Sequence, residues 1–472
     1  MVKDLTQGRP TKLITSFALT MLIGSMMSYI YGFTDSLMVG WFVNSDALGA
    51  VSASSAPMLM LNNLSVTIIG AFSITAGHIF GSGDHKLLRR MMANATYLTA
   101  FLVGLITIVS LIICRPLLQL MNTPDELMEM SVTYLTIIIL AKPFGAPTWL
   151  LSGMFRALGD TKTPLYIGLI NGFGNVVFNF IFLYVFPMGI AGAALGTLCS
   201  TATGSLLYLI LFKRKMNMLH FGREEATPSF PMMKRLLGIG IPIGLESAVT
   251  SLGSMILQAA INVHGTAAIT GIAMGGKITS LFWIFFSVFE SALMCFCAQN
   301  LGAGQFPRVR RGVRNTLFIF FGIGGAFFLF TLTTLDRFVY MAFVGNDTAI
   351  LDFAHRYLIT QMAFFPCISM LFAWRAGLKS LGSTVPTLFC GIVELIARLF
   401  VSFFFADNIQ MLFFAGPMAW VGSSIFVAIL YPIVVRRMER KMREHDEKKV
   451  VQSAPCEPEE DTAEEQWVVQ KR

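Results

Sequence analysis

The chain has 472 residues, of which 55% are hydrophobic and only 13% are charged, and its mean hydropathy is +0.67. Soluble domains carry about 25% charged residues, so this composition excludes a protein built only of soluble domains. The net charge of +8 suggests nucleic acid as a partner, but the positions of the basic residues argue against it. The seven cysteines are scattered mostly through apolar stretches, which is typical of small core residues and not of a disulfide framework or a zinc site.

Twelve apolar segments follow a polar N-terminus, and each is long enough to cross a bilayer, which takes about 20 residues. The first six predicted helices lie near 13–41, 52–80, 91–113, 130–155, 163–186 and 190–212. A polar stretch, 213–235, interrupts the series. The other six lie near 236–263, 271–300, 313–335, 352–378, 384–406 and 409–435. The tail, 436–472, is highly charged; we expect it to be helical to about 449 and disordered beyond.

The basic residues lie mainly on one side of the predicted membrane. Of the 35 Lys and Arg residues, 29 fall in the tail and in the loops that an inside N-terminus places in the cytoplasm, and three in the opposite loops. Arg375 and Lys379 are counted in one of these cytoplasmic loops. This asymmetry predicts a plasma-membrane protein with both termini cytoplasmic, and it explains the basic charge by contact with anionic lipid instead of nucleic acid.

The two halves of the chain resemble each other. From Gly81 to Asn94, five of fourteen positions are identical to residues 221 positions later. RALGDTKTP at 156–164 aligns with KSLGSTVPT at 379–387 at a nearly equal offset of 223 positions. Both blocks lie in equivalent predicted loops, where we expect glycines to allow tight turns. These glycines are Gly81, Gly83, Gly302 and Gly304.

The repeat predicts the fold class. Each half has six helices, an even number, so both halves begin on the same side and their symmetry axis runs along the membrane normal. We expect an all-α integral membrane protein of twelve transmembrane helices in two six-helix lobes related by a pseudo-two-fold. The expected domains are an N-lobe (1–212), a linker (213–235), a C-lobe (236–435) and a charged tail (436–472).

Four acids and three bases lie inside the apolar helices, a net charge of −1. Charged groups at the bilayer centre are costly and mark functional sites by default. A mildly acidic interior favours cationic substrates and coupling cations. The acids are Asp35, Glu246, Glu290 and Glu394, and the bases are Lys142, Lys277 and Arg398.

In the N-lobe, Asp35 is either an acid solvated at the outer helix end or a carboxylate that exchanges H⁺ or Na⁺. Asn175 and Asn179 are spaced i, i+4 and face one direction. Their amides would either hydrogen-bond between helices or join Asp35 in binding a hard cation.

In the C-lobe, Glu394 and Arg398 are also spaced i, i+4, and they form either a structural ion pair or part of a substrate cavity. With the repeat offset of 223, they occupy the positions of Asn171 and Asn175, so the lobes are chemically unequal. Glu246 and Glu290 are further candidates for this cavity.

The chain resembles the multidrug and toxic compound extrusion (MATE) family over about residues 10–435. The resemblance rests on the order and spacing of several motifs. They are FTDSLMVG (33–40), the two glycine-basic loops, LSGMFRALGDTKTP (151–164), NGFGNVVFNF (171–180) and GIAGAALGT (189–197).

The resemblance implies two lobes and drug efflux coupled to inward H⁺ or Na⁺. It also implies that Asp35 belongs to the cation site of the N-lobe, together with Asn175, Asn179 and Thr197. Some members carry an aspartate where this chain has Leu183, and this departure favours H⁺ over Na⁺.

We therefore expect a monomeric antiporter for small cationic or amphipathic compounds, without catalytic activity, metal or cofactor beyond the coupling ion. Phosphate binding by a P-loop at GIAMGGK (271–277) is excluded because Ile278 follows Lys277 where a P-loop needs Ser or Thr. The alternative is a flippase for lipid-linked saccharides, which would need a strongly basic cavity. The sequence does not determine the substrate or the partner of Lys142.

Overall fold

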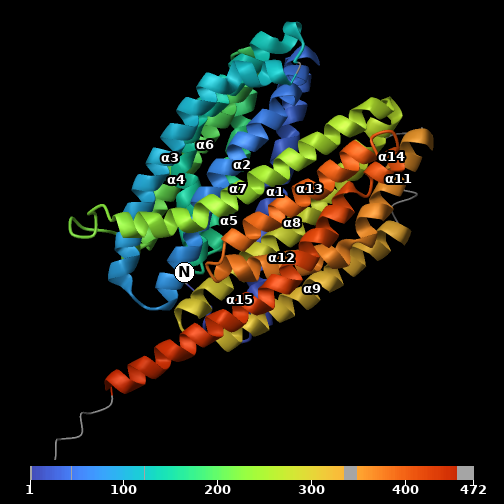
Figure 1. Ribbon diagram of the computed structural model, residues 1–472. Helices are drawn as coiled ribbons and strands as arrows, with labels where there is room; N and C mark the ends of the chain where they lie inside the picture. Colours follow the sequence, from blue (N-terminus) through green and yellow to red (C-terminus); the bar gives the residue numbers. More distant parts are fainter. Residues whose placement is uncertain (1–2, 44, 122, 334–347, 454–472) are drawn as a thin grey trace, which may run out of the picture. The chain divides into compact units, whose positions relative to one another are not determined.

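The computed structural model describes residues 3–43, 45–121, 123–333 and 348–453. All regular elements in these ranges are helices (Figure 1). Eleven of the described helices are long and apolar enough to cross a membrane, and a pair bent by 50° supplies a twelfth span. The predicted all-α membrane fold is confirmed. The chain forms two compact units, Met1–Tyr431 and Pro432–Arg472.

All six helices predicted for the first half are present. They are α1 (Pro10–Phe42), α2 (Ser45–Gly81), α3 (His85–Leu120), α4 (Asp125–Ala157), α5 (Lys162–Phe180) with the π-helical turn η1 (Ile181–Val185), and α6 (Gly189–Lys215). Pro143 and Pro147 lie inside α4. Prolines are tolerated in bundled membrane helices because neighbouring helices satisfy the freed backbone groups.

The second half also has its predicted helices. They are α7 (Phe230–Ile261), α8 (Thr266–Gly302), α9 (Phe306–Thr333), the bent pair α11 (Thr348–Ala363) and α12 (Phe365–Ser380), α13 (Val385–Phe404), the short α14 (Ile409–Leu412) and α15 (Ala415–Ser453). Short 3-10 turns, η2 (Asn217–Leu219) and η3 (Asn262–His264), follow α6 and α7. The bend before Pro366 follows from the missing N–H of proline. The predicted helical extension of the tail is confirmed to Ser453, and its predicted disordered part, 454–472, lies outside the described residues.

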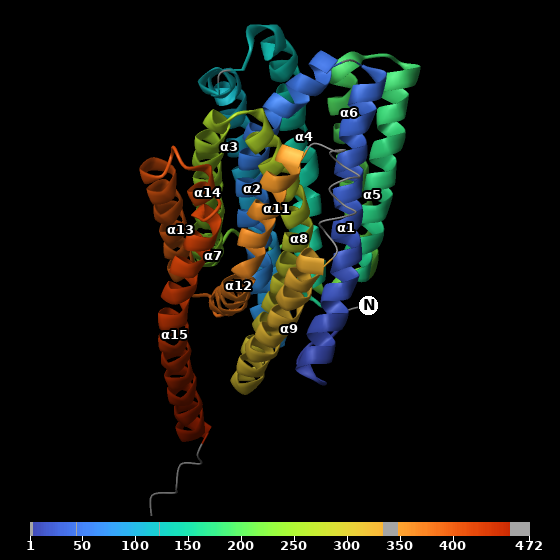
Figure 2. The same ribbon diagram turned by 90° about the vertical axis from the view of Figure 1, so that its right-hand side faces the viewer.

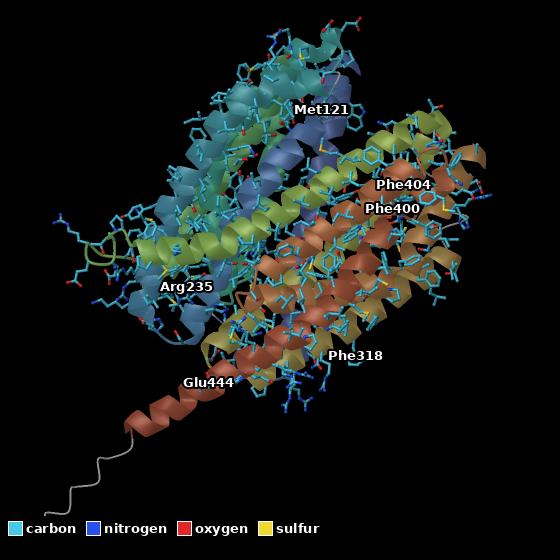
Figure 3. All side chains as sticks on the ribbon, in the orientation of Figure 1. Met121, Arg235, Phe318, Phe400, Phe404 and Glu444 are labelled. Atoms are coloured by element: carbon cyan, nitrogen blue, oxygen red, sulfur yellow. The ribbon has the colours of Figure 1, made fainter. Side chains whose placement is uncertain are left out.

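Helices pack mainly within their own half. In the first half, α4 contacts α2, α3 and α6, while α5 contacts α1 and α6. In the second, α7 packs on α13, and α8 packs on α9, α11 and α12. Figure 2 shows α1 running beside α5. Large apolar side chains such as Phe318, Phe400 and Phe404 remain exposed on the outer helices (Figure 3), as expected where lipid replaces water.

The two halves meet where α2 packs on α7 and α8 and where α1 packs on α8. The α2–α8 crossing shows the symmetry of this contact. A Cβ at Gly81 would overlap the backbone oxygen of Gln299, and a Cβ at Gly302 would overlap that of His78. His78 and Gln299 are 221 positions apart, as are Gly81 and Gly302. Each contact therefore has its mirror in the repeat, which is the signature of a two-fold relation, and the predicted pseudo-two-fold is confirmed.

The loop glycines fall into two groups. Gly83 and Gly304 have φ values of 78° and 73°, a region that favours glycine, so they form the predicted turns. Gly81 and Gly302 do not form turns; they end α2 and α8. Their lack of a side chain allows the close helix crossing, a role that the turn prediction missed.

The segment between the two halves is shorter than the predicted 213–235, because α6 continues to Lys215 and α7 begins at Phe230. Basic residues in the last turn of α6 suit a helix C-terminus. Arg89 of α3 bonds Glu225 through Nε and Oε1 at 2.9 Å, and this hydrogen bond holds the pKa of Glu225 below its usual value. The segment is thereby fastened to the first half.

The residues before α1 connect the two halves. The Lys3 N–H donates to the Leu158 oxygen at 3.1 Å, after α4. The Leu5 N–H donates to Gln299 Oε1 at 2.9 Å, and the Leu5 oxygen accepts from Asn300 Nδ2 at 3.1 Å, both on α8. Leu5 itself is only 1% exposed. Its hydrogen bonds therefore link the end of α4 to α8, in addition to the contact at the α2–α8 crossing.

Candidate functional site

In the first half, the two predicted asparagines lie on α5 against α6. Asn179 is fully buried, and its Nδ2 lies 3.4 Å from Asn175 Oδ1. A Cβ at Gly196 would overlap Asn179 Oδ1, so this glycine allows α6 to approach the amide. Thr197 follows it in α6, and its hydroxyl donates to the Ala193 oxygen at 3.3 Å.

The packing of α1 on α5 sets the level of Asp35. Leu165 of α5 contacts Gly24, where a Cβ would lie 3.4 Å from it, and Tyr31 lies against Gly172. Both pairs are 141 positions apart, and the same spacing places the backbone of Asp35 level with residue 176. It therefore lies between the levels of Asn175 and Asn179. The Asp35 side chain lies outside the described residues, so the predicted grouping remains a prediction.

In the second half, the four predicted residues belong to one buried network. Glu246 is on α7, Glu290 on α8, and Glu394 and Arg398 on α13. Two further bases, Arg375 and Lys379 of α12, join them. We call these six residues the C-lobe charge network: Glu246, Glu290, Arg375, Lys379, Glu394 and Arg398.

Arg375 is the centre of the network. Its guanidinium lies 3.1 Å from Glu246, 3.6 Å from Glu290 and 3.7 Å from Glu394. The Arg375 guanidinium also lies 4.7 Å from the centre of the Phe372 ring, at cation–π distance. One base on α12 thus links acids from three other helices.

Lys379 and Arg398 complete the pairing. Lys379 Nζ lies 3.3 Å from Glu246 and 3.4 Å from Glu290. Arg398 Nη2 lies 3.4 Å from Glu394, and Arg398 Nη1 donates to the Thr250 oxygen at 3.1 Å. Glu246 Oε2 is buried and accepts no hydrogen bond from the described residues. One carboxylate oxygen of the network thus has no hydrogen-bond donor among the described residues.

Sequence reasoning assigned Arg375 and Lys379 to a cytoplasmic loop, and this was wrong. Both lie inside α12, which continues to Ser380, and their side chains are only 12% and 9% exposed. Their i, i+4 spacing within an apolar stretch was an available signal of one shared helix face.

The correction changes the charge balance. The network contains three acids and three bases and is neutral. The acidic excess expected from the sequence disappears once Arg375 and Lys379 are counted inside. Lys277, counted as an interior base, is exposed on α8. Lys142 is only 5% exposed, and its Nζ makes no hydrogen bond to any described residue.

A cavity of about 350 Å³ lies beside the network in the second half. Glu394, Arg375 and Arg398 line it together with aromatic side chains. Trp283 stands between two of these rings, at 5.6 Å from Trp420 and 5.4 Å from Phe372. A cavity with several aromatic walls and few charged groups is typical of a small-molecule site.

These features define a class of protein. Two pseudo-symmetric bundles of membrane helices, with ionisable groups buried inside each, are typical of secondary transporters. A profile of the MatE family matches residues 21–185 and 242–404, one segment in each half, and the segments begin 221 positions apart. The chain belongs to this family.

Relatives and solved structures agree with this assignment. The chain is 27% identical to a probable multidrug resistance protein of Bacillus subtilis, over 83% of this chain and 87% of that one. It is 26% identical to a multidrug export protein of Staphylococcus haemolyticus, over 57% and 59%. Its fold matches a MOP superfamily transporter from Pyrococcus furiosus with a TM-score of 0.85 at 19% identity, over 92% and 98%. An outward-facing multidrug resistance MATE family transporter matches with the same values.

Proposed function

We propose that the protein is a secondary active exporter that moves amphipathic organic compounds, cationic ones among them, out of the cell in exchange for H⁺ or Na⁺. The observation that carries this proposal is the symmetric α2–α8 crossing. It joins two pseudo-equivalent halves, each with buried polar or charged groups. Rocking such halves about a shared contact gives alternating access. The relatives named above are multidrug resistance or export proteins, which supports a similar substrate range.

The coupling ion in this proposal binds in the first half. Asp35 would exchange a proton, with Asn175, Asn179 and Thr197 around it. Leu183, where some family members have an aspartate, is 2% exposed in η1 and offers no oxygen to Na⁺. This favours H⁺. The C-lobe residues Glu246, Glu290, Glu394 and Arg398 would shape the substrate cavity.

Asp35→Asn tests the coupling role. Asparagine resembles the protonated acid but cannot lose a proton, so the variant should fold and lose ethidium efflux driven by a pH gradient. The measurement is efflux from proteoliposomes under separately imposed pH and Na⁺ gradients. Asp352→Asn, at an exposed acid paired with Arg356, is the control and should transport normally. Ethidium efflux by Asp35→Asn at the wild-type rate under a pH gradient would refute the coupling role.

Export requires the orientation that the charge asymmetry favours, in the plasma membrane with both termini cytoplasmic. In a background without native cysteines, a cysteine at Val263, which is 75% exposed after α7, should react with an impermeant thiol reagent added outside intact cells. A cysteine at Gly222, in the segment between the halves, should react only after the cells are opened. The reverse pattern would contradict this orientation.

The flippase alternative is less well supported. A lipid pyrophosphate carries several negative charges and needs a strongly basic cavity, whereas the C-lobe charge network is neutral. Both halves lie in one chain, so a single copy contains both proposed sites, in agreement with a monomeric transporter.

A further inference from the structure

A cavity of about 240 Å³ lies between the two halves. Its walls come from α2 and α4 of the first half and from α7, α8 and α12 of the second. Gly70 and Ser291, both in its lining, are repeat equivalents, 221 positions apart. A Cβ at Gly77 would lie 2.8 Å from the Cβ of its own equivalent, Ala298. We call this the interlobe cavity, and these pairs place it on the pseudo-two-fold axis.

Each half contributes one base to the interlobe cavity. Arg156 comes from α4 and Lys379 from α12, and the two are repeat equivalents. The acid in the lining, Glu290, lies 3.4 Å from Lys379, which also contacts Glu246 at 3.3 Å. Lys379 and Glu290 thus belong to the neutral C-lobe charge network. The cavity adds a single further charge, that of Arg156.

Arg156 has no counter-charge in the part of the chain that the structure describes. Among the described residues, its guanidinium bonds Ser152 alone, one turn earlier, with Nε 3.2 Å from the backbone oxygen and Nη2 3.4 Å from the hydroxyl. Asp160, one turn later, instead accepts from the Thr163 N–H at 3.0 Å and the Thr163 hydroxyl at 2.8 Å. A partly buried charge without a partner is costly, so an anion at Arg156 would be favoured.

Three hydroxyls of the lining add further donors. Ser73 donates to Gly70 at 2.6 Å, Ser287 to Ile284 at 3.0 Å, and Ser291 to Ser287 at 2.9 Å, each to a backbone oxygen of its own helix. Hydroxyl groups rotate freely enough to donate to a ligand instead. The cavity thus offers hydroxyl donors from α2 and α8 and one base, Arg156, that is unpaired among the described residues. Its other charged groups, Lys379 and Glu290, neutralise each other, so the cavity suits a single anionic group.

We propose that the interlobe cavity binds the anionic group of an amphipathic ligand, a carboxylate, sulfonate or phosphate, with Arg156 as its counter-ion. The guanidinium can bind such a group through two parallel hydrogen bonds. The cavity volume suits a charged group better than a whole drug-sized ligand, which needs about 300–1,000 Å³. The inference rests on the proposed function in one respect: the ligand is a transported compound with an anionic group on an aromatic body.

The test compares two ligands that differ in one charge. Norfloxacin carries a carboxylate, and its methyl ester does not. We expect the full-length protein in phosphatidylcholine nanodiscs to bind norfloxacin about tenfold more tightly than the ester, as for other buried charge pairs. Arg156→Gln should reduce this ratio to about one, and Arg156→Lys should retain much of it. Lys277→Gln, at an exposed base of α8, is the control and should leave the ratio unchanged.

A wild-type ratio of one or below, or an Arg156→Gln ratio equal to that of the wild type, would overturn the proposal. Adding phosphatidylglycerol identifies the source of the anion. Competition with norfloxacin in the wild type but not in Arg156→Gln supports the site and assigns it to a lipid headgroup. If phosphatidylglycerol competes with norfloxacin equally in the wild type and in Arg156→Gln, Arg156 is not the counter-ion of the bound anion.

Ethidium efflux separates this inference from the proposed function. Ethidium has no anionic group, so its export by the wild-type protein tests the proposed function independently of the anion site. If the protein exports ethidium but its preference for norfloxacin over the methyl ester does not depend on Arg156, the anion site is refuted and the proposed export is not. A protein that shows the ratio but exports nothing refutes the proposed export alone.

Discussion

Replacing Arg375 by methionine should lower the free energy of unfolding by about 3–5 kcal/mol, because one partner of a buried charge network is removed. Methionine keeps much of the volume but leaves three buried carboxylates with two bases. The net charge of the network changes from zero to −1 among side chains that are at most 12% exposed. Unfolding in mixed micelles, followed by circular dichroism, measures the loss.

Two variants control this experiment. Arg356→Met removes a base whose partner Asp352 lies 2.9 Å away, but both side chains are more than half exposed. It should therefore cost less than about 1 kcal/mol. Glu246→Gln in the Arg375→Met background restores neutrality and should recover part of the stability, a coupling that a double-mutant cycle detects. Equal losses in Arg375→Met and Arg356→Met would show that the network is solvated.

Gly302→Ala should separate α2 from α8. The added methyl group would overlap the backbone oxygen of His78, and a backbone atom cannot rotate away as a side chain can. Overpacking of a rigid contact costs about 1–3 kcal/mol. We therefore expect lower stability together with faster reaction of Cys295, which lines the interlobe cavity, with a thiol reagent. Mass spectrometry of the labelled peptide measures that reaction.

Gly276→Ala is the matched control for this variant. Gly276 lies in the same helix, but a Cβ there would meet no atom within 4 Å. Its methyl group should leave both stability and Cys295 labelling unchanged. If Gly302→Ala behaves in the same way as Gly276→Ala, the close crossing does not hold the halves together.

The sequence by itself determined the membrane class, the positions of the helices and the repeat. These are properties of local composition, since a bilayer demands long apolar helices wherever the chain crosses it. The family resemblance likewise needed only the order of motifs. The selection of Glu246, Glu290, Glu394 and Arg398 as candidates also came from local context, because charged residues within apolar helices are rare.

Only the tertiary structure decided which charged residues meet. Helix packing placed Arg375 and Lys379 against acids from three other helices, and no rule based on loop charge distinguishes a buried last turn from a cytoplasmic one. The same holds for Gly81 and Gly302, whose role depends on the helix that crosses them. Arg156 shows the difference most clearly. Its position in the repeat is visible in the sequence, but the cavity that it lines exists only between two packed halves.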